Sequence, residues 1–535
     1  MTKRLRTLLL LFGLSGGWLF AQESLVSPLD IPLFLSGNFG ELRGGHFHSG
    51  IDIKTQERTG FAVRAVKSGY ISRVNVSPSG YGNALYINHP DGTTSVYAHL
   101  NGFMPDIEKA VRDRQYKNES FAVQLYFTAA QFPVKQGEQV AWSGDSGSSG
   151  GPHLHFELRD TKTEKPFDPL SALMSQIPDT LAPQVRGVRL YPQRGTGVAN
   201  GNVAWGKIGL GIEAYDRMNG QRNIYGIYEL LLQVDSVPVY HVVMDSFSFD
   251  DTRYLNSYID WLTWFENRSY YTKAFTEPGN RLCIRRLQNN GVIDVNEERT
   301  YHCEFILRDV YGNECRYPID ILGQRQEIPP TAGKRFLYNQ ANTYSDKGID
   351  LHIPKGNLYT DLYLSPDTVP SATAFSPVYQ IRERAPLHSY CPLVLDVTKD
   401  NYPDKSKYGV VSYWKKEKTW LGGDYRNGKM YVKIRETGDF AVETDTLPPV
   451  IQPVNQTQWT SKRCLQFKVS DDLSGIQSYR GTLDGRYALF EYDAKNQALS
   501  CRYDPQRMKS GSQTLLLTVK DAAGNKTSVK YTVKF

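Results

Sequence analysis

Short runs that alternate apolar and polar residues recur between glycine-rich turns in the first third of the chain. Four of these runs predict half-buried β-strands, because successive side chains of a strand point to opposite faces: residues 62–66, 70–76, 84–88 and 93–98. Asp91-Gly92 predicts a hairpin turn between the last two strands. Pro105 to Asn118 instead places Ile107 and Val111 among charged residues, which predicts one short helix.

A divergent repeat occupies the later part of the chain. Asp179-Thr-Leu-Ala-Pro and Asp445-Thr-Leu-Pro-Pro open two similar modules, which end near Asp309-Val-Tyr-Gly-Asn and Asp521-Ala-Ala-Gly-Asn. A strand, an aspartate-rich turn, further strands and a hairpin, in this order, favour an immunoglobulin-like sandwich. Between the modules, the segment that opens near Pro329-Pro330 has strand-like runs and predicts another β domain of uncertain type.

The N-terminus has the three-part pattern of a secretory signal peptide. Lys3, Arg4 and Arg6 precede an apolar run from Leu8 to Phe20, and the small residue Ala21 follows it. This run is shorter than the roughly 20 residues that a membrane-spanning helix needs. We therefore expect cleavage after residue 21, export, and no transmembrane segment in the mature chain, with an uncleaved anchor as the alternative.

Charge and cysteine usage narrow the functional classes. The 535-residue chain has 62 Lys+Arg and 56 Asp+Glu, a formal net charge of +6, and the signal peptide carries three of the positive charges. So small a mature charge gives no strong case for nucleic acid as a partner. No cysteine precedes Cys283, which excludes a cysteine nucleophile or a cysteine-ligated metal in the first third. Cys464 and Cys501 can join within one module, but the sequence fixes no disulfide pairing.

The histidines are unevenly distributed. Of ten in the chain, six fall between His46 and His155. His153 and His155 are two apart in a predicted strand, so their side chains share a face. His48 and Asp52 are four apart around a glycine, which indicates a strand–turn geometry. Imidazole and carboxylate ligands suit a catalytic zinc with an open position for water, whose pKa the metal lowers.

In this order the fragments resemble peptidase family M23, the lysostaphin or LytM type of zinc endopeptidase. The residues that carry the resemblance are His48-x-x-x-Asp52, Tyr97-Ala-His99-Leu and Gly-Pro-His153-Leu-His155-Phe-Glu. Residues 36–43 and 134–144 are also similar to strands of that family, so the resemblance covers roughly residues 30–170. It implies Zn²⁺ held by His48, Asp52 and His155, with His99 and His153 as the catalytic pair.

The resemblance also implies a compact antiparallel β core with a groove, and hydrolysis of peptide bonds in peptidoglycan stem peptides or cross-links. All five positions hold the required residue type, which speaks against the inactive members that activate other hydrolases. We expect a peptidoglycan endopeptidase in the periplasm or cell envelope of a Gram-negative bacterium. A non-hydrolytic envelope-binding or hydrolase-activating protein, and an adhesion-type protein dominated by its β domains, are the alternatives.

The expected fold is therefore mostly β. A signal peptide (1–21) and an M23-like peptidase domain (22–178) precede an immunoglobulin-like domain (179–326), a β domain of uncertain type (327–444) and a second immunoglobulin-like domain (445–535). The later β domains can dock an envelope protein partner. The helix at 105–118 and the aromatic run after it lengthen the family core, and a covering role is favoured over a groove wall.

Other polar residues have competing interpretations. His46 can support its ligand neighbour or lie on the surface, and Arg43 can hold a substrate carboxylate or a structural salt bridge. No role is assigned to His89. Residues 147–151 match the Gly-x-Ser-x-Gly string of serine hydrolases, but a proline and a strand follow where that motif needs a helix. The turns at Asp216 and Asp471-Asp472 can bind calcium, although capping of backbone amides is favoured.

Overall fold

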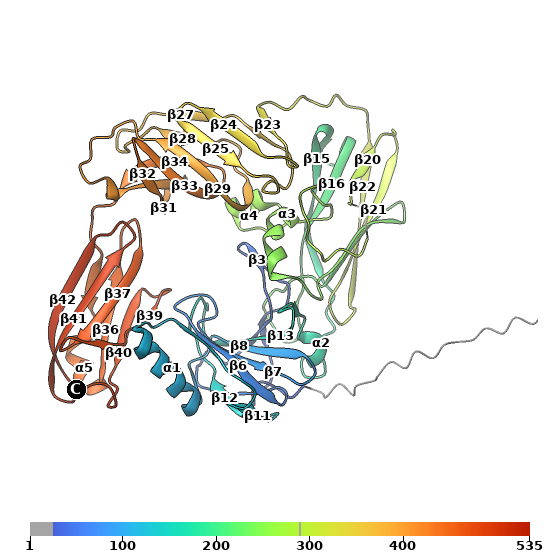
Figure 1. Ribbon diagram of the computed structural model, residues 1–535. Coiled ribbons are helices and arrows are strands. Elements are labelled where there is room, and N and C mark those ends of the chain that lie inside the picture. The colour runs from blue at the N-terminus through green and yellow to red at the C-terminus, as the bar shows by residue number, and fades with distance from the viewer. Residues whose placement is uncertain (1–24, 288–289) are drawn as a thin grey trace, which may run out of the picture.

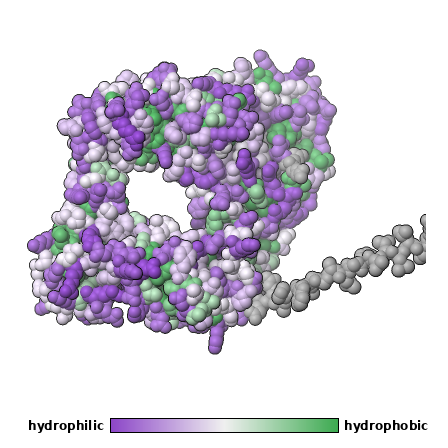
Figure 2. Space-filling model, viewed as in Figure 1, coloured by the Kyte–Doolittle hydropathy of each residue, from purple (hydrophilic) through white to green (hydrophobic). Residues whose placement is uncertain are grey.

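The computed structural model describes residues 25–287 and 290–535, so the predicted signal peptide lies outside the described residues. Strands dominate it, which confirms the mostly β fold class. Four hydrophobic cores follow one another along the chain. The domains surround a central opening (Figure 1), and Figure 2 shows that this opening passes through the molecule. None of the helices in the described residues is both long and apolar enough to cross a membrane.

The N-terminal domain (residues 25–178) has a nine-stranded antiparallel sheet, a three-stranded sheet and a hairpin. All four predicted strands and the predicted helix are present within it. Its elements are β1 (Leu35–Gly37), β2 (Leu42–Arg43), β3 (His46–Phe47), β4 (Ile51–Lys54), β5 (Ala62–Arg64), β6 (Gly69–Val76), β7 (Asn83–Asn88), β8 (Thr93–Ala98), β9 (Gly102–Phe103), α1 (Pro105–Asn118), β10 (Val123–Tyr126), β11 (Pro133–Val134), β12 (Gln139–Trp142), β13 (His153–Asp160), β14 (Pro166–Phe167) and α2 (Leu170–Leu173).

Strand β13 lies in the middle of the large sheet, whose order is β1-β4-β13-β8-β7-β6-β10. It is buried on both faces for most of its length, although Leu154, Phe156 and Leu158 on one face alternate with polar and charged residues on the other. Its register places His155 beside Asp52 of β4 on one side and beside Ala98 of β8 on the other. His99 directly follows β8, so the three fragments singled out in the sequence meet at one end of adjacent strands.

The second domain (residues 179–326) joins its strands into one continuous eight-stranded sheet, because β16 pairs with β15, β22, β19 and β20. Short helices between β18 and β19 cover one part of it. The elements are β15 (Gln184–Asn200), β16 (Val203–Tyr215), β17 (Glu229–Val234), β18 (Val237–Val243), η1 (Phe249–Tyr254), α3 (Leu255–Tyr258), α4 (Trp261–Asn267), β19 (Thr272–Lys273), β20 (Ile293–Val295), β21 (Thr300–Arg308) and β22 (Glu314–Gly323).

The third domain (residues 327–444) has two five-stranded sheets and a two-stranded one. Its core lies between the alternating apolar faces of the larger sheets. The elements are β23 (Lys334–Phe336), β24 (Asn342–Asp346), β25 (Ile349–Ile353), β26 (Leu362–Leu364), β27 (Asp367–Val369), β28 (Val378–Gln380), β29 (Pro386–Asp396), η2 (Lys405–Lys407), β30 (Tyr408–Trp414), β31 (Glu417–Gly422), β32 (Asp424–Arg426), β33 (Lys429–Glu436) and β34 (Asp439–Thr444).

The C-terminal domain (residues 445–535) is a sandwich of two four-stranded sheets. All six cysteines of the chain lie in the described residues and all are free thiols, so Cys464 and Cys501 form no disulfide here. The elements are β35 (Val450–Pro453), η3 (Gln456–Gln458), α5 (Trp459–Lys462), β36 (Cys464–Ser470), β37 (Ile476–Leu483), β38 (Arg486–Ala488), β39 (Glu491–Asp493), β40 (Ala498–Arg502), β41 (Ser512–Asp521) and β42 (Lys526–Lys534).

The first two domains interlock. Phe39 and Phe47 of the N-terminal domain are buried in the core of the second domain, where both rings contact Phe247. In exchange, Met218 and Tyr225 of the second domain are buried in the N-terminal core. The two domains therefore pack as one unit across residue 178.

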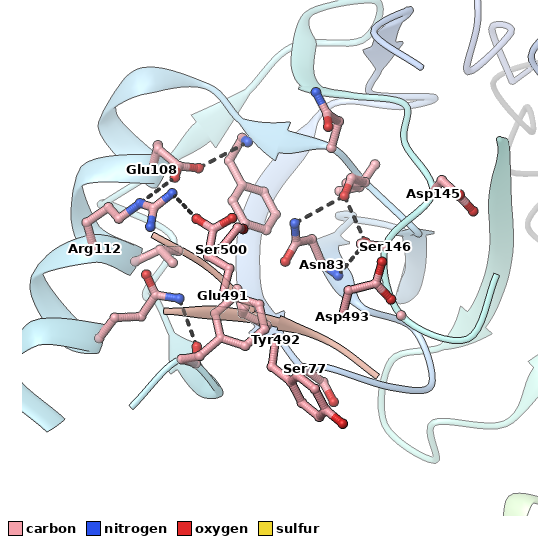
Figure 3. A pocket seen from close by; sticks show the side chains of 18 of the residues that line it. Ser77, Asn83, Glu108, Arg112, Asp145, Ser146, Glu491, Tyr492, Asp493 and Ser500 are labelled. Atoms are coloured by element: carbon pink, nitrogen blue, oxygen red, sulfur yellow. Dashed lines mark hydrogen bonds and ion pairs between the residues drawn. The ribbon is translucent and has the colours of Figure 1, made fainter. Parts of the chain in front are cut away.

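The C-terminal domain folds back onto helix α1 (Figure 1). Arg112 of α1 lies between Glu108 and Glu491, at 2.7 Å from the latter, beside a cavity of about 420 Å³ (Figure 3). Tyr116 of α1 packs edge-on against Tyr487. Helix α1 covers the N-terminal core with Ile107 and Val111, as predicted, and its outer face docks a distant domain, which was not predicted.

Candidate metal centre and catalytic site

Three predicted metal ligands converge at the end of β4 and β13. His48 lies in the turn before β4, Asp52 lies within β4, and His155 lies on the neighbouring β13. His48 Nε2 is 3.1 Å from Asp52 Oδ1 and 3.0 Å from His155 Nδ1, and the last two atoms are 2.9 Å apart. All three side chains are buried. Two imidazole nitrogens and one carboxylate oxygen thus face a common point.

The hydrogen bonds behind the two imidazoles fix which nitrogen is free. His48 Nδ1 is 2.7 Å from the carbonyl oxygen of Asn38, so its N–H donates there and Nε2 keeps a lone pair. His155 Nε2 is 2.8 Å from Glu157 Oε1, so its N–H donates there, and Nδ1 is the nitrogen that faces the centre and can bind a metal once it is deprotonated. Such outer hydrogen bonds orient metal-binding histidines in known metal sites. The donor set and its orientation therefore fit a tetrahedral zinc with one open position.

Charge at the centre is balanced by basic groups. Burial works to raise the pKa of Asp52, but His48, His153 and His155 outweigh it and hold the pKa well below its usual value. Arg43 also donates to Asp52 Oδ2 at 3.0 Å and contacts Glu41. The carboxylate is thus ionised and ready to act as a ligand. Of the two roles considered for Arg43, a contact to a substrate carboxylate and a structural salt bridge, the structure contains the salt bridge.

Glu157 is a fully buried carboxylate to which the sequence assigned no role. It accepts hydrogen bonds from Ser49 (2.5 Å), Tyr81 (2.6 Å), His155 and Arg159 (2.6 Å). Burial works against its ionisation, yet Arg159 and His155 lower the pKa below its ordinary value. The signal that could have revealed it is its spacing, since residues 153, 155 and 157 share one face of a strand.

The two other predicted histidines lie beside the ligands. His153 Nδ1 is 2.8 Å from the carbonyl oxygen of Gly151, and its Nε2 is 3.3 Å from Asp52 Oδ1. His99 Nδ1 is 2.9 Å from the carbonyl oxygen of Ser146, and its ring centroid is 4.8 Å from that of His153. Burial, together with the charges of His155 and His153, lowers the pKa of His99 to about 3. His99 is therefore neutral, with Nδ1–H committed and Nε2 free.

The loop before β13 takes part in this arrangement. The Ser149 hydroxyl donates to the carbonyl oxygen of Gly151 and lies 3.2 Å from His153 Nδ1. No helix follows residues 147–151, since β13 begins at His153, so the serine-hydrolase motif lacks its required context. His46 is exposed in β3, and His89 is buried with its nitrogens bonded to Ser68 and Ser95.

A groove of about 640 Å³ runs beside the centre. One wall comes from β1, β4 and the residues around them, and the other comes from residues 150–153. Asp52 and His153 line it, so the ligand set opens into the groove. Charged side chains, among them Glu41, Arg43 and Lys54, line much of it.

The family model of peptidase family M23 matches residues 46–116, which include His48, Asp52 and His99. The N-terminal domain thus matches peptidase family M23 over the segment that carries three of the five predicted site residues. A Zu5-like domain model matches residues 333–445, which is nearly the whole third domain.

Relatives of this M23 domain match only part of the chain. A DD-carboxypeptidase/endopeptidase Mpg of Neisseria meningitidis is 32% identical over 127 residues, 24% of this chain and 23% of the relative. The cell division protein DipM of Caulobacter vibrioides is 29% identical over 140 residues, 25% and 19% of the two chains. The chain therefore matches about a quarter or less of the length of these relatives. The catalytic domain of lysostaphin from Staphylococcus simulans is 25% identical, with a TM-score of 0.20, over 26% of this chain and 90% of that one.

Proposed function

We propose that the protein is an exported zinc-dependent endopeptidase that hydrolyses peptide bonds in peptidoglycan stem peptides or cross-links. The observation that carries the proposal is the convergence of His48, Asp52 and His155, with His99 and His153 beside them, in an M23 domain. In this proposal the first three residues are the metal ligands and the last two are the catalytic pair. The predicted signal peptide supports export to the periplasm or cell envelope.

The ligands are prepared by their own partners. The carbonyl oxygen of Asn38 orients His48 so that Nε2 faces the centre, and Glu157 orients His155 so that Nδ1 faces it. Arg43 donates to the second carboxylate oxygen of Asp52. Zinc, when bound there, polarises the scissile carbonyl and lowers the pKa of a water molecule at its open position.

The catalytic pair moves the proton. His99 is neutral and offers Nε2 as an acceptor, while His153 has its Nδ1–H committed to Gly151. An imidazole in this position takes a proton from the attacking water and returns it to the leaving amine. Once an imidazole of this pair holds that proton, its Nε2–H can donate to the oxyanion that forms on the scissile carbonyl.

A cleavage assay on intact peptidoglycan tests the proposal. Mature protein (residues 22–535) is incubated with Gram-negative peptidoglycan, with and without a zinc chelator, and the products are identified by mass. We expect new peptide ends that disappear with chelator and with His153→Ala. His302→Ala is the matched control, because its side chain is 71% exposed in the second domain, away from the site.

The alternatives make different predictions in the same assay. Stoichiometric zinc binding with unchanged peptidoglycan in every condition contradicts the proposal and favours a binding or activating protein. Retention of cellular function by residues 179–535 alone favours the adhesion-type protein.

A further inference from the structure

Three buried aspartates meet where the N-terminal domain joins the second domain. Asp179, Asp216 and Asp309 are 7%, 1% and 5% exposed, and one oxygen of each lies within 4.8 Å of the others. Asp179 follows the N-terminal domain, Asp216 follows β16, and Asp309 follows β21. Asp216 and Asp309 also line a cavity of about 10 Å³ at this junction.

Two carboxylate oxygens of this cluster accept no hydrogen bond from the described residues. Asn313 occupies both oxygens of Asp309, through its backbone N–H and its side-chain amide. Asp179 Oδ1 accepts from the N–H groups of Leu181 and Asn219. Among the described residues, Asp179 Oδ2 and Asp216 Oδ1 have no hydrogen-bond partner. Amide capping, the favoured interpretation from sequence, thus accounts for only part of the cluster.

Two unpaired carboxylate oxygens are costly in a buried site. Burial, and then the charges of Asp309 and Asp179, raise the pKa of Asp216 to about 8. The cluster therefore needs a positive charge or a proton to neutralise it. The sequence repeat helps to distinguish a bound cation from a proton.

The C-terminal domain contains a related but more exposed arrangement, in which the three carboxylates within 4.8 Å of one another are Asp445, Asp471 and Asp472. Asp521 is bonded to Asn525 as Asp309 is bonded to Asn313, and Asp445 accepts from the N–H of Leu447 as Asp179 does from Leu181. Asp471, at the position of Asp216, again has an oxygen without a partner among the described residues. Two modules that differ in most residues thus keep the same hydrogen bonds around their acids and the same unpaired oxygen, and this recurrence favours a bound cation over a chance cluster of protonated acids.

We propose that Asp179, Asp216 and Asp309 form a structural calcium site. Carboxylate oxygens without nitrogen or sulfur donors are the ligands of a hard cation. Mg²⁺ keeps several of its waters, whereas the adjoining cavity has room for about one water molecule. Ca²⁺ accepts irregular sets of carboxylate and carbonyl oxygens at 2.3–2.6 Å, so it fits the geometry better.

The site holds the loop that supports the M23 centre. Asp216 and Tyr225 exchange backbone hydrogen bonds and close loop 216–226. In this loop, the backbone of Gly226 forms two hydrogen bonds with the side chain of Asn38, whose carbonyl oxygen accepts from His48. Calcium at Asp216 would therefore fix the loop against Asn38, which follows β1 and orients His48, a proposed ligand of the metal centre. This consequence for activity rests on the proposed function, whereas calcium binding does not.

Terbium luminescence tests the site directly, because Tb³⁺ is a calcium substitute that emits when a nearby tyrosine transfers energy to it. Tyr228 and Tyr311 line the same cavity as Asp216. Full-length mature protein is loaded with one equivalent of zinc, so that the M23 centre is filled, and is titrated with Tb³⁺ and then Ca²⁺. We expect emission that Ca²⁺ displaces and equimolar Mg²⁺ does not.

The variant Asp216→Asn keeps the shape of the side chain and removes its charge. We expect it to lower the calcium stoichiometry measured by calorimetry by one. It should also lose a calcium-dependent rise in Tm of about 3 °C. Asp294→Asn, on the exposed side of β20, is the matched control and should behave as wild type.

Two results overturn the proposal. One is the absence of Tb³⁺ emission and of binding heat from the wild-type protein at millimolar Ca²⁺. The other is calcium binding by Asp216→Asn that equals that of wild type. Neither measurement involves peptidoglycan, so failure of the peptidase assay leaves the calcium site open to test.

Discussion

At the scale of single residues, the proposed metal centre depends on side chains that do not bind the metal themselves. These side chains form hydrogen bonds with its proposed ligands. Glu157 is the clearest case, because four side chains donate to it and one of them is His155. By accepting the N–H of Nε2, it leaves Nδ1 free to bind metal. Glu157 is a positioning residue in this arrangement.

Glu157→Gln should weaken zinc binding and keep the fold at neutral pH. A glutamine keeps the shape but lacks the charge that holds His155 and Arg159, so we expect zinc affinity to fall by about 10- to 100-fold. Titration against a competing chelator measures this affinity. Ser171→Ala, in the short helix α2 of the same domain, is the control and should bind zinc as wild type.

The same variant has a defined pH signature. The pKa of Glu157 is lowered in the folded state, so the carboxylate stabilises the fold above its unfolded pKa of about 4.5. That stabilisation is lost as the pH falls through the lower, folded value. Thermal unfolding should therefore show Glu157→Gln less stable than wild type at pH 7, with the gap narrowing below about pH 4. An equal gap at both pH values contradicts this assignment.

The sequence predicted the five central residues and not their partners, for a physical reason. Residue type and spacing can be read directly from the sequence, and they single out His48, Asp52, His99, His153 and His155. The carbonyl oxygens of residues 38, 146 and 151 orient these histidines, and every residue type has such an oxygen. Only the folded chain reveals which carbonyls face the rings.

At the scale of elements, the loop before β13 positions the proposed catalytic pair, His99 and His153, by close backbone packing. Gly147 has φ +70°, and a Cβ there would lie 2.4 Å from the carbonyl oxygen of Gly80. The same loop supplies the carbonyl oxygen of Ser146 that holds His99. Strand periodicity predicted β5 to β8 and the hairpin at Asp91-Gly92, but the contact between two glycine loops has no periodic signal.

Gly147→Ala should therefore impair catalysis more than metal binding. The added methyl group must push residues 146–148 away from residues 80–82, which moves the partner of His99 and costs about 1–3 kcal/mol of stability. We expect peptidoglycan cleavage to fall by about tenfold or more while zinc affinity stays within about twofold, because His48, Asp52 and His155 lie on other elements. Gly102→Ala is the control, since its nearest neighbour would be 3.8 Å away. Equal losses of zinc affinity and cleavage contradict this separation.

At the scale of the whole molecule, the proposed boundary at residue 178 is not a boundary in packing. Phe47 is 1% exposed and contacts Phe247 and Tyr258 of the second domain. A fragment of residues 22–178 leaves Phe39 and Phe47 uncovered, and burial of each is worth about 1.5–3 kcal/mol. We expect this fragment to unfold at least about 5 °C below a fragment of residues 22–326, as measured by calorimetry. Equal transition temperatures contradict the interlocking.

The C-terminal domain contacts α1 and the residues near it through ion pairs whose members lie more than 340 residues apart in the sequence. Arg112 pairs with Glu491, Arg480 with Glu119, Arg507 with Asp113, and Lys495 with Asp145. The docking of α1 was not predicted, because a charge pattern does not reveal a partner so distant along the chain. Lys495 also donates to the carbonyl oxygen of Ser149, so the docked domain contacts the loop whose carbonyl oxygens orient His99 and His153.

Docking should therefore loosen when these charges are reversed or screened. Exposed ion pairs contribute at most about 1 kcal/mol each and are weakened by salt, so the contact is held marginally. We expect the double variant Lys495→Glu, Arg507→Glu to raise the undocked population by at least about tenfold, which small-angle scattering records as a larger radius of gyration. Wild type in 1 M salt should change in the same direction, and Lys530→Glu, exposed on β42, should not change. An unchanged radius in both conditions would assign the contact to the packing of Tyr116 on Tyr487, because apolar packing is not screened by salt.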